Sequence, residues 1–294
     1  MLWSSKTVPP VLLATAAIAL GCTGEVSDGA DADTSSTHAL LVVEQSAPAD
    51  DVASARSHAS VWFLRIADER DLSAATQLVT DQLELPQLGS CVAVGVGEES
   101  DVPEMSPVEL AFAGDVAMRA GNGATPLTLR FFPDVANLVS GVMYTLRDQD
   151  DLAVPFNSLI TVSATGTSDF EPVDASASPP PMPAGLAIDG HNLPSMDVEI
   201  QRGRSIGLTW TPGGEGDVIF VDVDPVPAVP SERVRCALAD TGVGEIPTMA
   251  VPETSEMSLA VHRSRDVPLR SDRGDVGMAH FDLSVSTHVR VAAP

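Results

Sequence analysis

Along most of the chain, hydrophobic and polar residues alternate one by one. From His280 to Val291, apolar side chains occupy one set of alternate positions over most of the stretch, and polar side chains occupy the other. A period of two places the apolar residues on one face of an extended strand, so the pattern predicts a half-buried β-strand. Shorter stretches of this kind are found at residues 40–43, 60–66, 91–96, 108–111, 127–132, 141–146, 159–163, 206–210, 219–223, 233–238 and 257–261.

One segment has a helical period. Between Asp71 and Leu83, apolar residues follow the spacing of one helix face, and a short helix is expected there. Elsewhere Gly, Pro, Asn or Asp separates most of the predicted strands, which favours a sandwich or barrel over alternating strands and helices. The predicted fold class is therefore all-β. The residues with helical spacing are Leu72, Ala75, Leu78 and Val79.

A proline-rich stretch, 175-ASASPPPMPAG-185, interrupts the alternation. Three successive prolines cannot donate the hydrogen bonds of a strand ladder, and they favour an extended spacer. We therefore expect two β-sandwich domains, at residues 38–172 and 184–294, joined by a Pro-rich linker at residues 173–183.

The first residues of the chain have a different character. Residues 11–21 carry no charge and follow Lys6, and this run is about half of the roughly 20 residues that a membrane-spanning helix requires. A charged start, a short apolar centre and small residues before a cleavage point are typical of a secretory signal. The run ends in Ala19-Leu20-Gly21-Cys22, which resembles the lipobox of bacterial lipoproteins, with Ala19 where that family usually has leucine.

The lipobox resemblance implies cleavage before Cys22, a diacylglycerol group on its sulfur and acylation of the new amino terminus. Residues 1–21 would then be a lipoprotein signal peptide, and three acyl chains exceed the two signals needed for stable anchoring. Residues 22–37 are acidic and rich in small residues, which predicts a flexible, solvated tether. By the sorting rule of that family, Thr23 in place of aspartate favours the outer membrane. The alternative is an ordinary secretory signal with an incidental cysteine.

The second half of the chain contains 205-SIGLTWTPGGEGDVIFVDV-223, in which Trp210 on an early strand precedes a Gly/Pro turn and a further strand. This arrangement resembles a fibronectin type III or immunoglobulin-like domain. The sequence departs from the immunoglobulin pattern at Val234, two residues before Cys236, where a tyrosine would stand. The departure leaves the order of the strands open but does not affect the sandwich class.

Composition argues against several functions. The chain has 16 Lys and Arg against 41 Asp and Glu, with a formal net charge of -25 at pH 7, which repels nucleic acid and anionic lipid headgroups. Aromatic residues make up only 4% of the chain, too few for the stacked rings of polysaccharide-binding sites. The sequence contains no phosphate loop, zinc-protease motif or dinucleotide fingerprint, so no cofactor is expected.

Two cysteines remain if Cys22 carries lipid. An exported location permits a disulfide between Cys91 and Cys236. Because the two fall in different predicted domains, such a bridge would join the halves of the protein. Two buried, unpaired thiols are the favoured alternative.

Three short motifs resemble functional ones. Ser205 lies in a G-x-S-x-G sequence, but a strand is expected after it where a hydrolase elbow has a helix. Asp240 begins a single Asp-Thr-Gly triplet, so an aspartic-protease mechanism would need a homodimer to supply the second carboxylate. Arg273, Gly274 and Asp275 spell the integrin-binding tripeptide, which we interpret as accidental. No catalytic residue is expected.

Two acidic clusters are weak candidates for calcium. Calcium takes six to eight oxygen ligands, and neither cluster supplies them, so solvated loops and no metal site are expected. His280 and His288 share one strand face but lie about 26 Å apart along it, too far to bind one metal. The calcium candidates are Asp148, Asp150, Asp151, Asp222 and Asp224.

Together, these features predict a non-enzymatic, lipid-anchored envelope protein with a structural or protein-interaction role. Its expected partners are the membrane, reached through the lipid, and other envelope proteins. A calcium-assisted surface adhesin is the first alternative, and a dimeric aspartic hydrolase acting through Asp240 is the second.

Overall fold

The structure of the protein is a computed structural model, which describes residues 36–80, 85–94, 108–121, 123–135, 139–146, 158–194, 198–229 and 233–292. The chain divides into two units, Met1–Thr34 and Ser35–Pro294, and the described residues all belong to the second. The predicted signal peptide, Cys22 and most of the predicted tether lie outside the described residues. So do the calcium candidates Asp148, Asp150 and Asp151.

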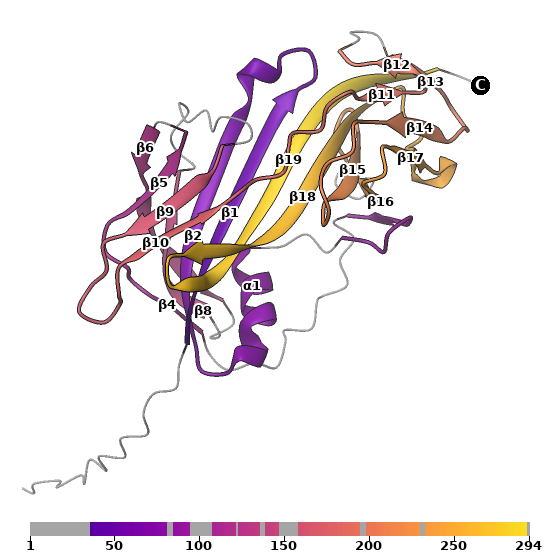
Figure 1. Cartoon of the computed structure of the whole chain (residues 1–294). Coiled ribbons are helices and arrows are strands. Elements are labelled where there is room, and N and C mark those ends of the chain that lie inside the picture. The colour runs from indigo at the N-terminus through magenta and orange to yellow at the C-terminus, as the bar shows by residue number, and fades with distance from the viewer. Residues whose placement is uncertain are drawn as a thin grey trace, which may run out of the picture. The chain divides into compact units, whose positions relative to one another are not determined.

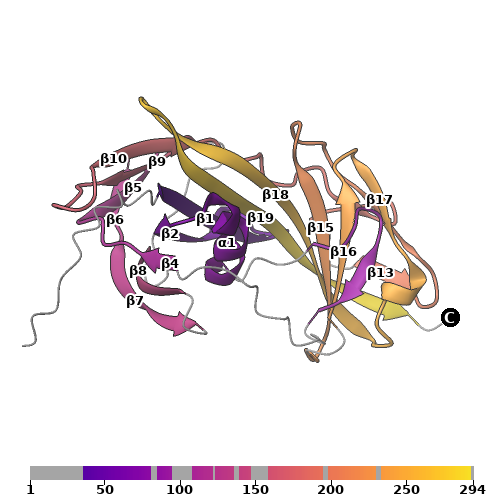
Figure 2. The ribbon, with the colours of Figure 1, turned by 90° about the horizontal axis from the view of Figure 1, so that it is seen from below.

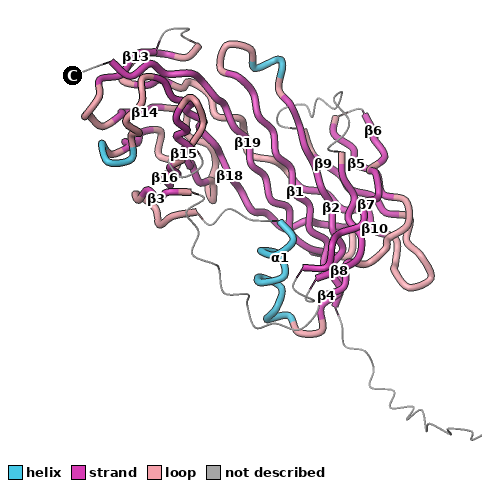
Figure 3. The backbone as a smooth tube through the Cα atoms, turned by 180° about the vertical axis from the view of Figure 1, so that it is seen from behind, coloured by secondary structure: helices cyan, strands magenta, loops and turns pink. Residues whose placement is uncertain are grey.

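The second unit is built from β-strands, which confirms the predicted fold class (Figure 1). Helix α1 (Leu72–Thr80) forms where the helical spacing predicted it, and Figure 3 shows it in cyan beside the long strands. The described part contains no helix long and apolar enough to span a membrane. The strands are β1 (Ser36–Pro48), β2 (Arg56–Ile66), β3 (Cys91–Ala93), β4 (Val108–Leu110), β5 (Val116–Ala120), β6 (Gly123–Pro126), β7 (Thr128–Val135), β8 (Val139–Thr145), β9 (Ile160–Ala164), β10 (Val173–Ala177), β11 (Ala187–Ile188), β12 (His191–Asn192), β13 (Val198–Gln201), β14 (Ile206–Thr209), β15 (Val218–Pro225), β16 (Val234–Ala239), β17 (Val243–Ile246), β18 (Glu256–Ser271) and β19 (Gly274–Ala292).

Most of these strands belong to one large sheet. Its main path runs β6-β5-β9-β10-β18-β19-β1-β2-β4-β8-β7, and β13 pairs with β19. Strand β15 pairs with β18 and with β16, which in turn pairs with β3. A smaller sheet has the order β12-β11-β14-β17. The antiparallel β18–β19 hairpin therefore connects strands from both halves of the chain (Figure 1).

Two hydrophobic clusters lie at different positions along this hairpin. The first is formed mainly by residues before position 178, together with Leu269 and Phe281 of the hairpin. The second is formed mainly by residues after position 185, together with Val261 and Val285. Figure 2 shows β18 and β19 running from one group of strands to the other. The two cores therefore share one hairpin.

The predicted linker is partly a strand. Residues 173–177 form β10, which pairs with β9 and with β18. Ala175 and Ala177 are buried in the first cluster, and the side chains between them are more exposed. Because the buried residues are alanines, their alternation with serine and aspartate gives a weak hydrophobic signal.

Strands β1 and β2 are buried on both faces. Leu41 and Phe63 face the first cluster, whereas Leu40 and Trp62 face a third cluster that includes Ala75 of α1. Burial on both sides explains the continuous apolar runs at residues 39–43 of β1 and 61–64 of β2. Helix α1 covers the second face and positions the main cavity described below.

Candidate functional site

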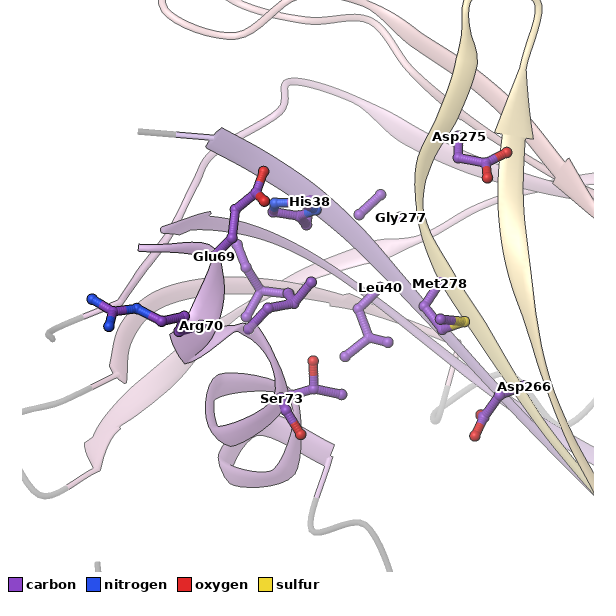
Figure 4. Close-up of a pocket in the computed structure, with 13 residues that line it drawn as sticks. His38, Leu40, Glu69, Arg70, Ser73, Asp266, Asp275, Gly277 and Met278 are labelled. Atoms are coloured by element: carbon purple, nitrogen blue, oxygen red, sulfur yellow. The ribbon is translucent and has the colours of Figure 1, made fainter. Parts of the chain in front are cut away.

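A cavity of about 580 Å³ lies between helix α1 and strands β1 and β19 (Figure 4). Its apolar lining comes from Leu40, Leu64, Leu72 and Met278. Leu40 and Leu64 are almost fully buried, whereas Met278 is 43% exposed. Cavities of this size, lined by apolar groups with a few polar ones, are typical of ligand-binding sites.

The floor depends on close contact between two parallel strands. Gly277 of β19 pairs with Ala39 of β1, and Met278 pairs with Leu40. A Cβ atom added at Gly277 would lie 1.7 Å from the carbonyl oxygen of Ala39. Glycine is therefore required at this position for β19 to approach β1.

A short turn before α1 forms one side of the rim. Asp68 caps this turn by accepting a hydrogen bond from the backbone N–H of Arg70. The Arg70 side chain also hydrogen-bonds the Asp68 carboxylate, and this contact lowers the pKa of Asp68 to about 2. Figure 4 shows the Arg70 guanidinium directed away from the cavity, while Glu69 lies next to His38 at its edge.

Carboxylates set the charge of the cavity mouth. Asp266 accepts a hydrogen bond from Nδ1 of His280 at 2.7 Å, and Asp275 accepts one from Arg270 at 3.2 Å. Glu69 has no ion-pair partner among the residues that the structure describes. Arg70 pairs with Asp68, Arg270 with Asp275 and His280 with Asp266, so the uncompensated negative charge at the mouth is that of Glu69.

The indole of Trp62 lies in the same cluster as Leu40 and Leu64 of the cavity floor. Its Nε1–H is buried and has no hydrogen-bond acceptor among the residues that the structure describes. Leaving such a donor unsatisfied costs about 1–3 kcal/mol. The cavity is thus bordered by an apolar cluster that contains one unsatisfied polar atom.

Three histidines pair with carboxylates on neighbouring strands, and one of these carboxylates, Asp266, lines the cavity. His58 contacts Glu44 at 2.7 Å, and His262 contacts Asp282 at 2.8 Å. The third pair is His280 with Asp266. Burial by itself lowers the pKa of His280, but the hydrogen bond to Asp266 and the nearby charges of Asp266, Asp282 and Glu44 outweigh it and raise this pKa above its usual value.

These pairs do not form a metal centre. Throughout the described ranges, no group of three or more His, Cys, Asp or Glu could hold a metal ion. Asp222 accepts two hydrogen bonds of 2.7 Å from Arg235, whose side chain is 4% exposed, and Asp224 pairs with Arg233. These two calcium candidates are therefore already neutralised by arginine.

Asp240 is part of a buried ion-pair network. Its carboxylate accepts hydrogen bonds from Nε1 of Trp210 at 2.5 Å, from the backbone N–H of Gly213 at 2.9 Å and from Nε of Arg263 at 2.9 Å. The side chains of Arg263 and Asp240 are only 1% and 3% exposed. This burial and this set of donors assign Asp240 a structural role.

The same network holds the proline-rich segment. Arg263 donates further hydrogen bonds to the carbonyl oxygens of Pro181, Met182 and Thr211. Asp217, also fully buried, pairs with Arg265 and accepts from the backbone N–H of Gly214. Sequence reasoning missed Arg263, although it continues the alternation of Leu259 and Val261 and so occupies an inward-facing position.

The other motifs have no catalytic geometry. Ser205 is followed directly by strand β14, whereas the serine of a hydrolase elbow is followed by a helix. The Arg-Gly-Asp tripeptide lies at the β18–β19 turn, where Arg273 pairs with Glu171 at 2.8 Å and Asp275 with Arg270. His288 lines a separate, smaller cavity of about 190 Å³.

Cys91 and Cys236 are joined by a disulfide across 145 positions of sequence. They are register partners in the antiparallel pair of β3 and β16. The expectation that unpaired thiols were favoured is therefore wrong for this structure. The reason is that β3, from the first half of the chain, pairs with a strand of the second half, and sequence spacing gives no signal of that pairing.

Comparisons with known proteins give no family. No family model and no curated protein matches this sequence. Among solved structures, it is similar to the FN1–FN3 domains of chicken CNTN1, with 8% identity and a TM-score of 0.21 over 81% of this chain and 63% of that one. It is also similar to murine CEACAM1b, with 9% identity and a TM-score of 0.20 over 86% of this chain and 100% of that one. Both likenesses are too weak to support an argument.

Proposed function

We propose that this protein is a non-enzymatic component of the bacterial cell envelope, anchored to the outer membrane by lipid on Cys22, with a structural or protein-interaction role. The main support for a non-enzymatic role is the environment of Asp240, the residue with the clearest catalytic motif. Both of its oxygens accept hydrogen bonds from protein donors, and its side chain is shielded from solvent. A carboxylate held in this way is not accessible to a substrate.

The anchoring part of the proposal rests on the sequence. Cys22 follows an apolar run of signal-peptide length, and the first described strand, β1, begins at Ser36. The residues between Cys22 and β1 would then connect the lipid to the folded unit. An acidic, polar connection of this kind favours solvent over the membrane core.

Radiolabelled palmitate and membrane fractionation test the anchor. We expect the unmodified chain to incorporate palmitate and to sediment with the outer membrane, and Cys22→Ala to lose both properties. Ser27→Ala, a neighbouring substitution outside the lipobox, should keep both. A Cys22→Ala chain that stays membrane-bound would contradict the proposal. Protease treatment of intact and lysed cells then determines which side of the membrane the protein faces.

The two alternative functions predict different outcomes in a calcium titration and in a proteolysis assay. A calcium-assisted adhesin predicts a higher melting temperature on adding calcium, whereas the arginine pairing of Asp222 and Asp224 supports no change. A dimeric aspartic hydrolase predicts proteolysis that disappears in Asp240→Asn. The proposal expects no proteolysis from the unmodified chain.

A further inference from the structure

We infer that the cavity between α1 and the β18–β19 hairpin binds a small cationic amphiphile, a molecule with an apolar chain and a positively charged amine. This binding site goes beyond the proposed function and does not depend on the lipid anchor. The inference rests on the apolar floor, the volume and the charge of the mouth.

The lining of the cavity is mainly apolar on the sheet and helix sides. Leu40 and Leu64 of the sheet are almost fully buried, and the exposed apolar surface comes from Leu72 in the first turn of α1 and from Met278. Met278 lies beside Leu40 and leaves 43% of its surface exposed to the cavity and solvent. An apolar chain placed between the helix and the sheet would remove this surface from water, at roughly 25 cal/mol per Å².

The mouth determines the charge of the ligand. Glu69, which has no ion-pair partner in the described part of the chain, lies at one edge beside His38 (Figure 4). Asp266 and Asp275 lie on the hairpin side, where His280 and Arg270 pair with them. Among the described residues that line the cavity, Arg70 is the only arginine, and its guanidinium points outward and pairs with Asp68. A cationic head is therefore attracted and an anionic head repelled, because opposite charges across an interface favour binding.

The volume suits a small molecule. About 580 Å³ lies within the range of roughly 300–1,000 Å³ that is typical of small-molecule sites. The described lining combines charged side chains with the hydroxyl groups of Ser73 and Thr76 on α1, and Glu69 is its one carboxylate without an ion-pair partner, so a ligand with a single charged end suits it. A linear alkylammonium has this division of polarity.

The test uses the chain from residue 22 onward with Cys22→Ala, so that neither lipid nor detergent competes for the cavity. Decylammonium, decyl sulfate and methylammonium are titrated, and binding is followed by NMR of the methionine methyl groups. Met278→Leu assigns the Met278 signal, and Met249, which is 91% exposed and outside the cavity, is the internal control. We expect a saturable shift of Met278 with decylammonium, at least about fivefold tighter than with decyl sulfate. Methylammonium, which lacks the chain, should give no saturable shift.

Three variants locate the site. Glu69→Gln should weaken decylammonium binding about two- to fivefold, as expected for a surface charge pair, and Glu199→Gln on β13 should leave it unchanged. Ser73→Trp fills the cavity from an exposed position of α1 and should abolish binding at an unchanged melting temperature. Equal affinity for the ammonium and the sulfate would overturn the charge assignment. If decylammonium shifted the Met249 and Met278 signals in parallel, or if the Met278 shift did not saturate, the binding site itself would be overturned. Both of these results are measured without the cavity variants, so they do not depend on how a variant folds.

Discussion

The guanidinium of Arg263 and the carboxylate of Asp240 form a hydrogen-bonded ion pair at 2.9 Å with almost no access to solvent. Arg263 lies on β18 between Val261, which belongs to the second core, and Leu269, which belongs to the first. Its remaining donors bind carbonyl oxygens at the proline-rich segment and at Thr211. A polar network therefore holds the segment that passes from one half of the chain to the other.

Breaking this pair should be costly. Arg263→Leu leaves the Asp240 carboxylate buried without its cation, and we expect the free energy of unfolding to fall by about 3–5 kcal/mol. Urea denaturation measures the change. Arg273→Leu breaks an exposed pair with Glu171 and should cost at most about 1 kcal/mol. A similar loss in both variants would show that the buried pair has no special role.

The backbone at Gly213 is packed against the same network. A Cβ atom there would lie 2.1 Å from Oδ2 of Asp217 and 2.8 Å from Oδ2 of Asp240. Gly213→Ala should therefore reduce stability by about 1–3 kcal/mol, the usual cost of overpacking. Gly123→Ala is the matched control, since its Cβ would meet only one atom, at 4.0 Å. Equal melting temperatures for the two variants would argue against close packing at Gly213.

His280 should make stability depend on pH. Its pKa in the folded protein is raised above the value of about 6.5 expected in the unfolded chain, so the folded state binds the proton more tightly. The stabilisation is then fully present below pH 6.5 and is lost as pH rises through the folded pKa. His280→Gln should be destabilising at pH 5 and close to neutral at pH 9, as measured by urea denaturation at each pH.

The groups that produce this dependence are Asp266, Asp282 and Glu44, which act on His280 from β18, β19 and β1. His191→Gln, on the exposed strand β12, is the control and should show the same small change at both pH values. A His280→Gln variant that became more destabilised as pH rose would contradict the assigned direction of the pKa shift.

Removing the disulfide should loosen the connection between the two halves. Cys91 and Cys236 close a loop of 145 positions, and loss of a native disulfide typically costs about 2–5 kcal/mol. We expect the double variant Cys91→Ala, Cys236→Ala to lose stability by that amount, and reductant to have no further effect on it. Thiol labelling of the denatured, unreduced wild-type chain should modify neither cysteine. Labelling of both would show that the bridge is absent from the isolated protein.

The alternation of apolar and polar residues determined the fold class and located much of the sheet. Strands β14, β15 and β19 and helix α1 all form where the spacing predicted them. The sequence did not reveal strands such as β10 and β5, in which alanines provide part of the buried face. Small side chains bury little apolar surface, so their periodicity is faint.

The tertiary structure alone decided which distant residues meet. Alternation states that a strand has a buried face but does not state which strand lies beside it, because register and neighbours depend on the whole sheet. The disulfide, the pairing of Asp240 with Arg263 and the approach of Gly277 to Ala39 all join segments far apart in sequence. The candidate cavity is of the same kind, since its lining comes from β1, β2, α1 and the hairpin, and these elements become adjacent only in the folded protein.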